Sequence, residues 1–158
     1  MRLQQDVGGD RLAGEIGALT RVHAVSAARE AARRVIATCR LEAFAESRAR
    51  SLPIGLRKRL EVSRALATQP RLLLLDEVMS GLNPTELVEM IEILRRLHGD
   101  GLGLIVIEHI MAAMMRLAQR IVVLHHGEKI AEGRPEAISR DPRVVDAYLG
   151  EEFVFADA

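Results

Sequence analysis

The sequence predicts an α/β fold that begins with a small helical segment. Two strongly aliphatic runs, at residues 72–75 and 104–107, have the length and composition of buried strands. A helix start, Asn83-Pro84-Thr85-Glu86, lies between them, with a capping residue, a proline at the first helical position and an acid at the third. Strands that alternate with helices in this way are typical of a parallel sheet, and therefore of the α/β class.

The first 70 residues show no strand pattern. Residues 1–25 contain four glycines and no sustained apolar period, so we expect a poorly defined N-terminal segment there. Residues 26–50 are rich in Ala, Arg and Glu and predict two short helices. Pro53 and Gly55 interrupt the chain before helical spacing resumes over 56–68, which together predicts a helical subdomain at 26–70.

Residues 71–158 form the predicted α/β core. Pro70 ends the preceding helix, and Arg71 to Asp76 is apolar on both faces, as a central parallel strand would be. Gly99-Asp100-Gly101 turns the chain into the second strand. The remaining elements are a second strand at 104–108, a short helix at 110–117, strands at 120–124 and 128–131 around His125-His126-Gly127, and a last helix from Asp141-Pro142 that Gly150 would cap.

Composition excludes several classes of protein. The chain of 158 residues is 49% hydrophobic and 28% charged, which is typical of a globular domain. No apolar stretch approaches the roughly 20 residues of a membrane helix, and the first residues have no apolar signal core. The single cysteine, Cys39, cannot form an internal disulfide, and we interpret it as an apolar filler on a helix.

Charge is distributed unevenly, but the pattern does not favour nucleic acid. Net charge is zero, with 13 basic and 7 acidic side chains in residues 1–70 and 9 basic and 15 acidic side chains in residues 71–158. The arginines of the basic half are not interleaved with aromatic residues, of which the chain has only four. We expect no nucleic-acid partner, and we interpret Arg57-Lys58-Arg59 as a solvated helix face or as the rim of the helix predicted from residue 56.

Chemistry is predicted at the end of the first strand, in Leu72-Leu73-Leu74-Leu75-Asp76-Glu77. A buried strand of this kind delivers two carboxylates to one edge of the sheet. Asp76 can hold Mg2+ directly or through water, and Glu77 can accept a proton from a water that attacks a γ-phosphate. His125-His126 has no partner cluster, so we interpret it as a turn and not as a metal site.

Four motifs in order resemble the ATP-binding subunits of ABC transporters, from about Ser26 to Glu151. The motifs are a signature motif at Leu52, Pro53, Ile54, Gly55 and Leu56; a Walker B strand at Leu72 to Glu77; a D-loop at Ser80, Gly81, Leu82 and Asn83; and a switch histidine, His109. Proline in the signature, Ile107-Glu108-His109 and the tail after Ile130 look like the branched-chain amino acid group.

The resemblance implies a P-loop NTPase fold with a small helical subdomain and an ATPase that uses Mg2+. It implies that Glu77 and His109 are catalytic, that His109 contacts the γ-phosphate, and that the signature motif faces ATP held by a second ABC ATPase subunit. It further implies transmembrane permease subunits as partners, a cytoplasmic position on the inner face of the plasma membrane, and coupling of ATP hydrolysis to amino acid import.

The sequence also departs from the family. No Gly-Lys pair occurs, so the chain contains no P-loop of the form G-x-x-x-x-G-K-[ST]. Leu56, Val78 and Ile110 replace residues that are commonly glutamine, proline and aspartate in the family. We therefore expect an incomplete ABC ATPase domain, inactive alone, whose missing P-loop strand exposes its neighbours in the sheet and lowers stability.

Two alternatives remain open at this point. The chain could be a catalytically dead module that keeps the dimer-facing signature and binds transporter partners without hydrolysing ATP. It could also resemble the ABC-type DNA-repair ATPases, which share the signature and Walker B logic. That class predicts long coiled-coil or DNA-binding segments, and the chain has neither.

Overall fold

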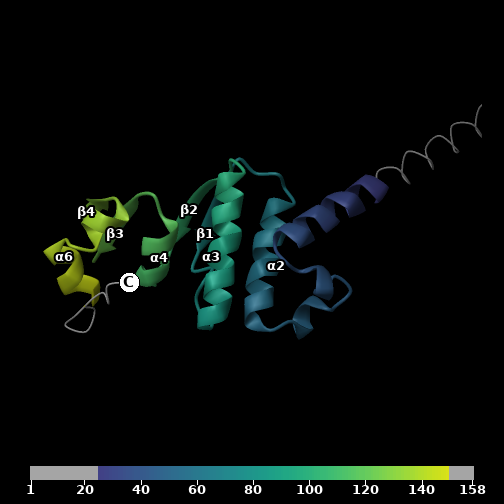
Figure 1. Cartoon of the computed structure of the whole chain (residues 1–158), viewed down its shortest axis with the longest axis horizontal. Coiled ribbons are helices and arrows are strands. Elements are labelled where there is room, and N and C mark those ends of the chain that lie inside the picture. The colour runs from purple at the N-terminus through teal and green to yellow at the C-terminus, as the bar shows by residue number, and fades with distance from the viewer. Residues whose placement is uncertain (1–24, 150–158) are drawn as a thin grey trace, which may run out of the picture. The chain divides into compact units, whose positions relative to one another are not determined.

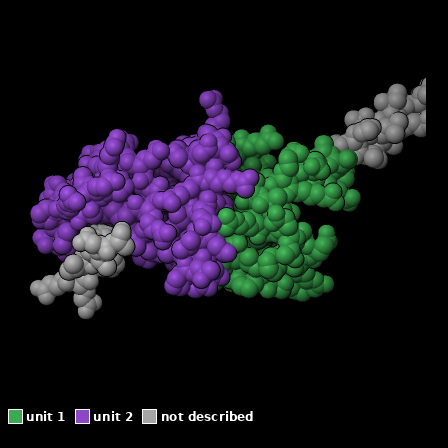
Figure 2. Space-filling view, in the orientation of Figure 1, with its two compact units in different colours: residues 1–70 green, residues 71–158 purple. Residues whose placement is uncertain are grey.

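The computed structural model describes residues 25–149 of the chain. The chain divides after Pro70 into two compact units, residues 1–70 and residues 71–158 (Figure 2). Figure 1 labels the four strands and the helices α2, α3, α4 and α6. The predicted loop at residues 1–25 lies outside the described residues except for Val25.

The first unit is helical, but its elements differ from the prediction. One helix covers residues 25–38, and two single turns of 3-10 helix follow, η1 (Glu42–Phe44) and η2 (Ala49–Ser51), where a second short helix was expected. The first helix ends because Arg40 adopts a left-handed φ of 55° and the Leu41 amide donates to the Ile36 carbonyl at 3.0 Å. This is the C-terminal arrangement that usually employs glycine, and it stops helical propagation.

Helix α2 (Ile54–Leu66) completes the first unit, and it begins two residues earlier than predicted. Pro53 is its N-cap residue, and the helix ends before Gln69, which has a left-handed φ of 54°. The expectation of a fully solvated basic face was wrong for Arg59, because that side chain is buried.

Cys39 is buried in the first unit as a free thiol. Burial raises the pKa of this thiol to about 11, although a hydrogen bond with Ser63 and the charge of Arg59 act in the opposite direction. A thiol that is this strongly protonated at neutral pH is a poor nucleophile. Its role is therefore packing, as the sequence indicated.

The second unit contains a parallel pair of strands, β1 (Leu72–Asp76) and β2 (Gly103–Ile107). Helix α3 (Pro84–Gly99) connects them. The predicted cap of α3 is present: the Asn83 side chain accepts from the Glu86 amide at 2.9 Å, and the Glu86 side chain accepts from the Asn83 amide at 3.0 Å. Two orphan amides of the first turn are thereby satisfied.

Only one face of β1 is covered by the described residues. Leu73 and Leu75 are buried, whereas Leu72 and Leu74 are exposed. The expectation of a strand buried on both faces was therefore wrong for the described part of the chain. The physical reason is that successive side chains of a strand point to opposite faces, and here a covering layer lies on one of them only.

The rest of the second unit surrounds an antiparallel hairpin. Its elements are α4 (Met111–Leu117), β3 (Ile121–His125), β4 (Glu128–Gly133), α5 (Pro135–Ile138), α6 (Pro142–Val144) and η3 (Val145–Leu149). The hairpin turns through His126 and Gly127, whose φ angles of 49° and 81° are those of a two-residue type I′ turn. Asp141 caps α6 as predicted, while Gly150 lies outside the described residues.

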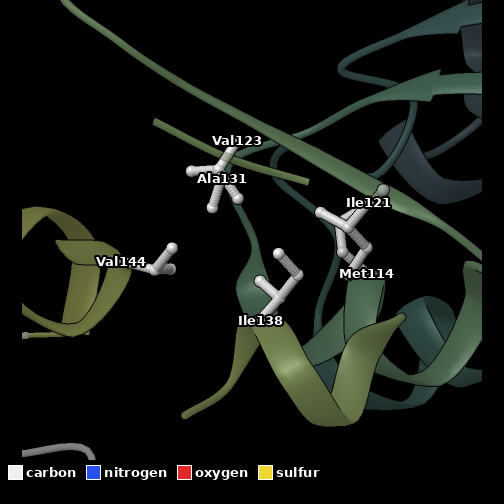
Figure 3. Packing of buried hydrophobic residues seen from close by; sticks show 6 residues of the cluster. All are labelled: Met114, Ile121, Val123, Ala131, Ile138 and Val144. Carbon is white, nitrogen blue, oxygen red and sulfur yellow. The ribbon is translucent and has the colours of Figure 1, made fainter. Parts of the chain in front are cut away.

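Five elements of the second unit share an apolar core. Figure 3 shows its buried side chains, which are Met114, Ile121, Val123, Ala131, Ile138 and Val144. Val106 of β2 packs against this cluster, and the Tyr148 hydroxyl donates to the Leu124 carbonyl. The hairpin thus packs both against β2 and against the C-terminal helices.

Candidate active site

The carboxyl ends of β1 and β2 meet at one edge of the second unit. The register pairs Asp76, the last residue of β1, with Ile107, the last residue of β2. Asp76 and Glu77 therefore leave the sheet beside Glu108 and His109. Two predicted motifs that are about thirty positions apart in the sequence come together because parallel strands end at a common edge.

Glu77 and His109 face each other at this edge. Oε1 of Glu77 lies 3.7 Å from Nδ1 of His109, and the two side chains are 60% and 62% exposed. The separation is too long for a direct hydrogen bond but within ion-pair range. The predicted base and the predicted γ-phosphate contact thus lie side by side, and both side chains are open to solvent.

The backbone at Glu77 is in an uncommon conformation. Its φ is 48°, in the left-handed region that costs a residue other than glycine roughly 1–2 kcal/mol. Its amide donates to the Ile107 carbonyl at 2.9 Å, and its carbonyl accepts from the Ser80 amide at 3.2 Å. The turn after β1 is therefore held at Glu77 by a bond to β2 and by a bond within the turn.

Glu108 makes a contact that the sequence analysis did not predict. Its Oε1 accepts from the Met79 amide at 2.6 Å. Its Oε2 is buried and has no hydrogen-bond partner in the part of the chain that the structure describes. The sequence contained one signal for Glu108. It is an acid directly after the second predicted strand, and the first predicted strand also ends in acids, Asp76 and Glu77.

The D-loop residues form the turn that leads into α3. Gly81 has a φ of 76°, a conformation that favours glycine. Asn83 uses its side-chain oxygen to cap α3. The structure thus gives Gly81 and Asn83 roles in shaping this turn, and their predicted part in nucleotide recognition, with that of Ser80 and Leu82, stays a prediction.

Asp76 fits the way in which Mg2+ is usually held beside a nucleotide. Its carboxylate is exposed at the end of β1, next to Glu77. The described residues contain no group of three or more His, Cys, Asp or Glu side chains that could enclose a metal. Mg2+ typically keeps several waters and takes one or two carboxylates together with substrate phosphates, so an open single carboxylate suits it.

The predicted signature residues belong to the first unit. Leu52 and Gly55 are buried, Pro53 and Ile54 are exposed, and Leu56 is half-buried. Gly55 is the second residue of α2, and the N-cap Pro53 supplies no side-chain hydrogen bond to the first turn. The amides at the start of α2 are therefore not capped by that side chain, a condition under which a helix N-terminus can receive an anion.

Comparison with family models identifies two matching regions. Residues 3–80 match the model described as ABC transporter, and residues 128–154 match the model described as branched-chain amino acid ATP-binding cassette transporter. The first match begins well before Ser26, where the resemblance was expected to start.

The described residues contain no helix that is long and apolar enough to cross a membrane.

Curated relatives and solved structures agree with these matches. The high-affinity branched-chain amino acid transport ATP-binding protein BraF of Pseudomonas aeruginosa is 39% identical over 70% of this chain and 44% of its own length. The lipopolysaccharide export system ATP-binding protein LptB of Acidithiobacillus ferridurans is 35% identical over 72% of this chain and 47% of its own length.

A crystal structure of an ABC transporter ATP-binding cassette in its ADP conformation superposes with a TM-score of 0.71 at 28% identity, over 77% of this chain and 50% of that one. This likeness confirms the predicted fold class. The chain spans about half the length of the curated relatives that it matches. Motif order, family models and fold together show that the chain belongs to the ATP-binding proteins of ABC transporters, in the branched-chain amino acid group.

Proposed function

We propose that this chain is the C-terminal portion of an ATP-hydrolysing subunit that drives an ABC importer of branched-chain amino acids. The observation that carries the proposal is the 3.7 Å approach of Glu77 to His109 at the common edge of β1 and β2. A carboxylate and an imidazole at this distance can act on one water and one phosphate. A module without catalytic function has no need for that arrangement.

The residues at the common edge of β1 and β2 have different proposed roles, which follow from their chemistry. Glu77 accepts the proton of the attacking water, and His109 holds the γ-phosphate in line with that water. Asp76 would hold Mg2+, which supplies charge neutralisation on the phosphates when it is bound. Because these groups stabilise charge that develops during transfer, they act mainly on turnover and little on ATP affinity.

The partners follow from the same family. ABC ATPase subunits work with transmembrane permease components, and the C-terminal match at residues 128–154 favours the branched-chain amino acid group over lipopolysaccharide export. We infer a second ATPase subunit that receives the signature motif of this one, and a position at the cytoplasmic face of the membrane. The exposed Pro53 and Ile54, and the absence of a side-chain cap from Pro53 at the start of α2, support this role of the motif.

The test joins a P-loop-bearing N-terminal segment of an ABC ATP-binding protein to residues 25–158 of this chain, to give what we call the fusion protein. We expect Mg2+-dependent ATP hydrolysis by the fusion protein and none by the chain alone, because the chain has no phosphate loop and no P-loop lysine. An inactive fusion protein that still binds ATP and folds would favour the alternative, a catalytically dead interaction module.

A second experiment addresses the partner subunit. In the fusion protein, Gly55→Glu should prevent ATP-driven dimerisation, since a bulky negative side chain would enter the position of a phosphate. Ala67→Glu, at the exposed C-cap of α2, provides a control with the same change of charge. Dimerisation measured by light scattering that is unchanged in Gly55→Glu would contradict the signature assignment.

A further inference from the structure

We propose that Glu108 is a positioning residue that sets the place of Glu77 by holding the turn after β1. This inference rests on the proposed ATPase function for its catalytic consequence, but the contact itself does not. Glu108 touches neither of the two predicted catalytic side chains in the hydrogen bonds described. It acts through the backbone of Met79, two residues beyond Glu77.

Two hydrogen bonds from the end of β2 hold the segment 77–79. The Ile107 carbonyl accepts from the Glu77 amide at 2.9 Å, and the Glu108 carboxylate accepts from the Met79 amide at 2.6 Å. The second bond is short, as is usual when the acceptor is charged. Since both amides are bound by consecutive residues at the end of β2, the backbone of Glu77 and the direction of its Cα–Cβ bond are restrained relative to His109.

The conformation of Glu77 makes such a restraint necessary. A left-handed φ of 48° is unfavourable for glutamate, and a residue stays in this region only when its surroundings determine it. Val78 and Met79 are buried and anchor the turn by packing. Packing alone leaves the Met79 amide without a partner, and the Glu108 carboxylate supplies that partner.

The other oxygen of Glu108 argues against a role in stability alone. Oε2 is buried and finds no hydrogen-bond partner among residues 25–149. An unsatisfied buried carboxylate oxygen is unfavourable, because the group has lost water and gained nothing in return. The net contribution of Glu108 to stability is therefore small, and we infer that its bond to the Met79 amide acts on the geometry of the adjacent site.

The first test uses the full chain and needs no activity. Glu108→Ala should accelerate hydrogen exchange at the Met79 amide by about tenfold or more, because the amide loses a charge-assisted bond. Glu108→Gln keeps an acceptor oxygen and should restore most of the protection. Glu136→Ala, an exposed acid in α5, serves as the control and should change nothing at Met79. Unchanged exchange at Met79 in Glu108→Ala would overturn the proposal.

A spectroscopic measurement separates positioning from simple destabilisation. In the same full-length variants, the ring resonances of His109 should move in Glu108→Ala and return toward those of the parent chain in Glu108→Gln. Exchange at Ile91 and Leu94, in the core of α3, should remain slow in both variants. If the α3 amides lose protection together with Met79, Glu108 supports the fold in general and the positioning role is wrong.

The catalytic consequence is tested in the fusion protein. Glu108→Ala should lower kcat by about tenfold or more while KM for ATP stays within about threefold, and Glu108→Gln should recover most of the rate. In a Glu77→Gln background, Glu108→Ala should have no further effect, because both changes remove the same function. Normal kcat in Glu108→Ala would overturn the proposal, whereas a fusion protein without any turnover would overturn the proposed function and leave the exchange and resonance tests to decide this inference.

Discussion

The two sheets of the second unit differ in the composition of their exposed faces. In the parallel pair, the uncovered side chains before the terminal Asp76 are aliphatic: Leu72, Leu74, Ile105 and Ile107 are 48%, 67%, 49% and 60% exposed. In the hairpin, Val122 pairs with Glu132 and Leu124 pairs with Lys129, so each exposed aliphatic residue stands opposite a charged one. The composition of the hairpin suits a sheet with one face in water, whereas the composition of the parallel pair suits a sheet that is covered on both faces.

This difference offers a physical reason for the position of the proposed active site. A parallel sheet that is enclosed on both faces is rigid, and its carboxyl ends can hold side chains in a fixed geometry. Asp76 ends β1, and Glu77 and His109 lie just beyond the ends of β1 and β2. The bare aliphatic face indicates that the chain provides only part of the enclosure, in agreement with its span of about half of its relatives.

The largest expected effect contrasts one acid from each sheet. Glu77→Gln in the fusion protein should lower turnover by about 10²- to 10⁴-fold, because the base for the attacking water is lost. Glu132→Gln, at the hairpin, should leave turnover unchanged. Steady-state phosphate release measures both variants. Mg2+-dependent turnover that survives in Glu77→Gln would remove the distinction between the two sheets.

The next effect contrasts two histidines. His109→Ala in the fusion protein should reduce turnover by about a hundredfold or more and leave ATP affinity within about tenfold, since the imidazole acts on charge that develops in the transition state. His125→Ala, at the end of β3, is the matched control and should behave like the parent. Nucleotide titration and single-turnover rates distinguish the two steps. Equal activity in His109→Ala would reduce this histidine to a residue that merely ends the strand.

A smaller effect tests the bare face itself. Leu74→Lys in the fusion protein should lower the free energy of unfolding by about 2 kcal/mol or more, because a leucine that the completed domain buries is replaced by a charge. In the isolated chain, the same change should reduce self-association, since an exposed apolar patch is removed.

Val122→Lys is the corresponding change on the hairpin, opposite Glu132, and its effect on stability should stay within about 0.5 kcal/mol. Denaturant titration measures stability, and sedimentation velocity measures association. If Leu74→Lys and Val122→Lys behave alike in the fusion protein, the two outer faces do not differ and the comparison fails.

The smallest effect is a pH dependence of the hairpin. A hydrogen bond from Lys129, followed by the charges of Lys129 and Arg120, holds the pKa of Glu132 below its ordinary value of 4.5. Because the folded pKa is lower than the unfolded one, this contribution to stability is complete above pH 4.5 and is lost as pH falls through the folded pKa. Glu132→Gln should therefore lower Tm slightly at pH 6 and leave it unchanged at the acid end. A Tm difference that is constant with pH would show that the carboxylate charge is not its source.

Local signals accounted for most of the elements. The capping box at Asn83 and Glu86 and the proline at position 84 fixed the start of α3, because the hydrogen bonds of a helix start join residues only a few positions apart. The two strands of the parallel pair and the hairpin were likewise recognisable from short runs. The helix over residues 25–38 was less predictable, since its end depends on a left-handed Arg40 in place of the usual glycine.

The sequence by itself determined the family, the order of the motifs and the identity of Asp76, Glu77 and His109 as candidates for chemistry. Only the tertiary structure brought Glu77 within 3.7 Å of His109 and attached Glu108 to Met79, a contact between residues 29 positions apart. It also revealed that one face of β1 is uncovered and that Arg59 is buried. The physical reason is that these features depend on strand register and on which layers are present, and neither is encoded in a window of neighbouring residues.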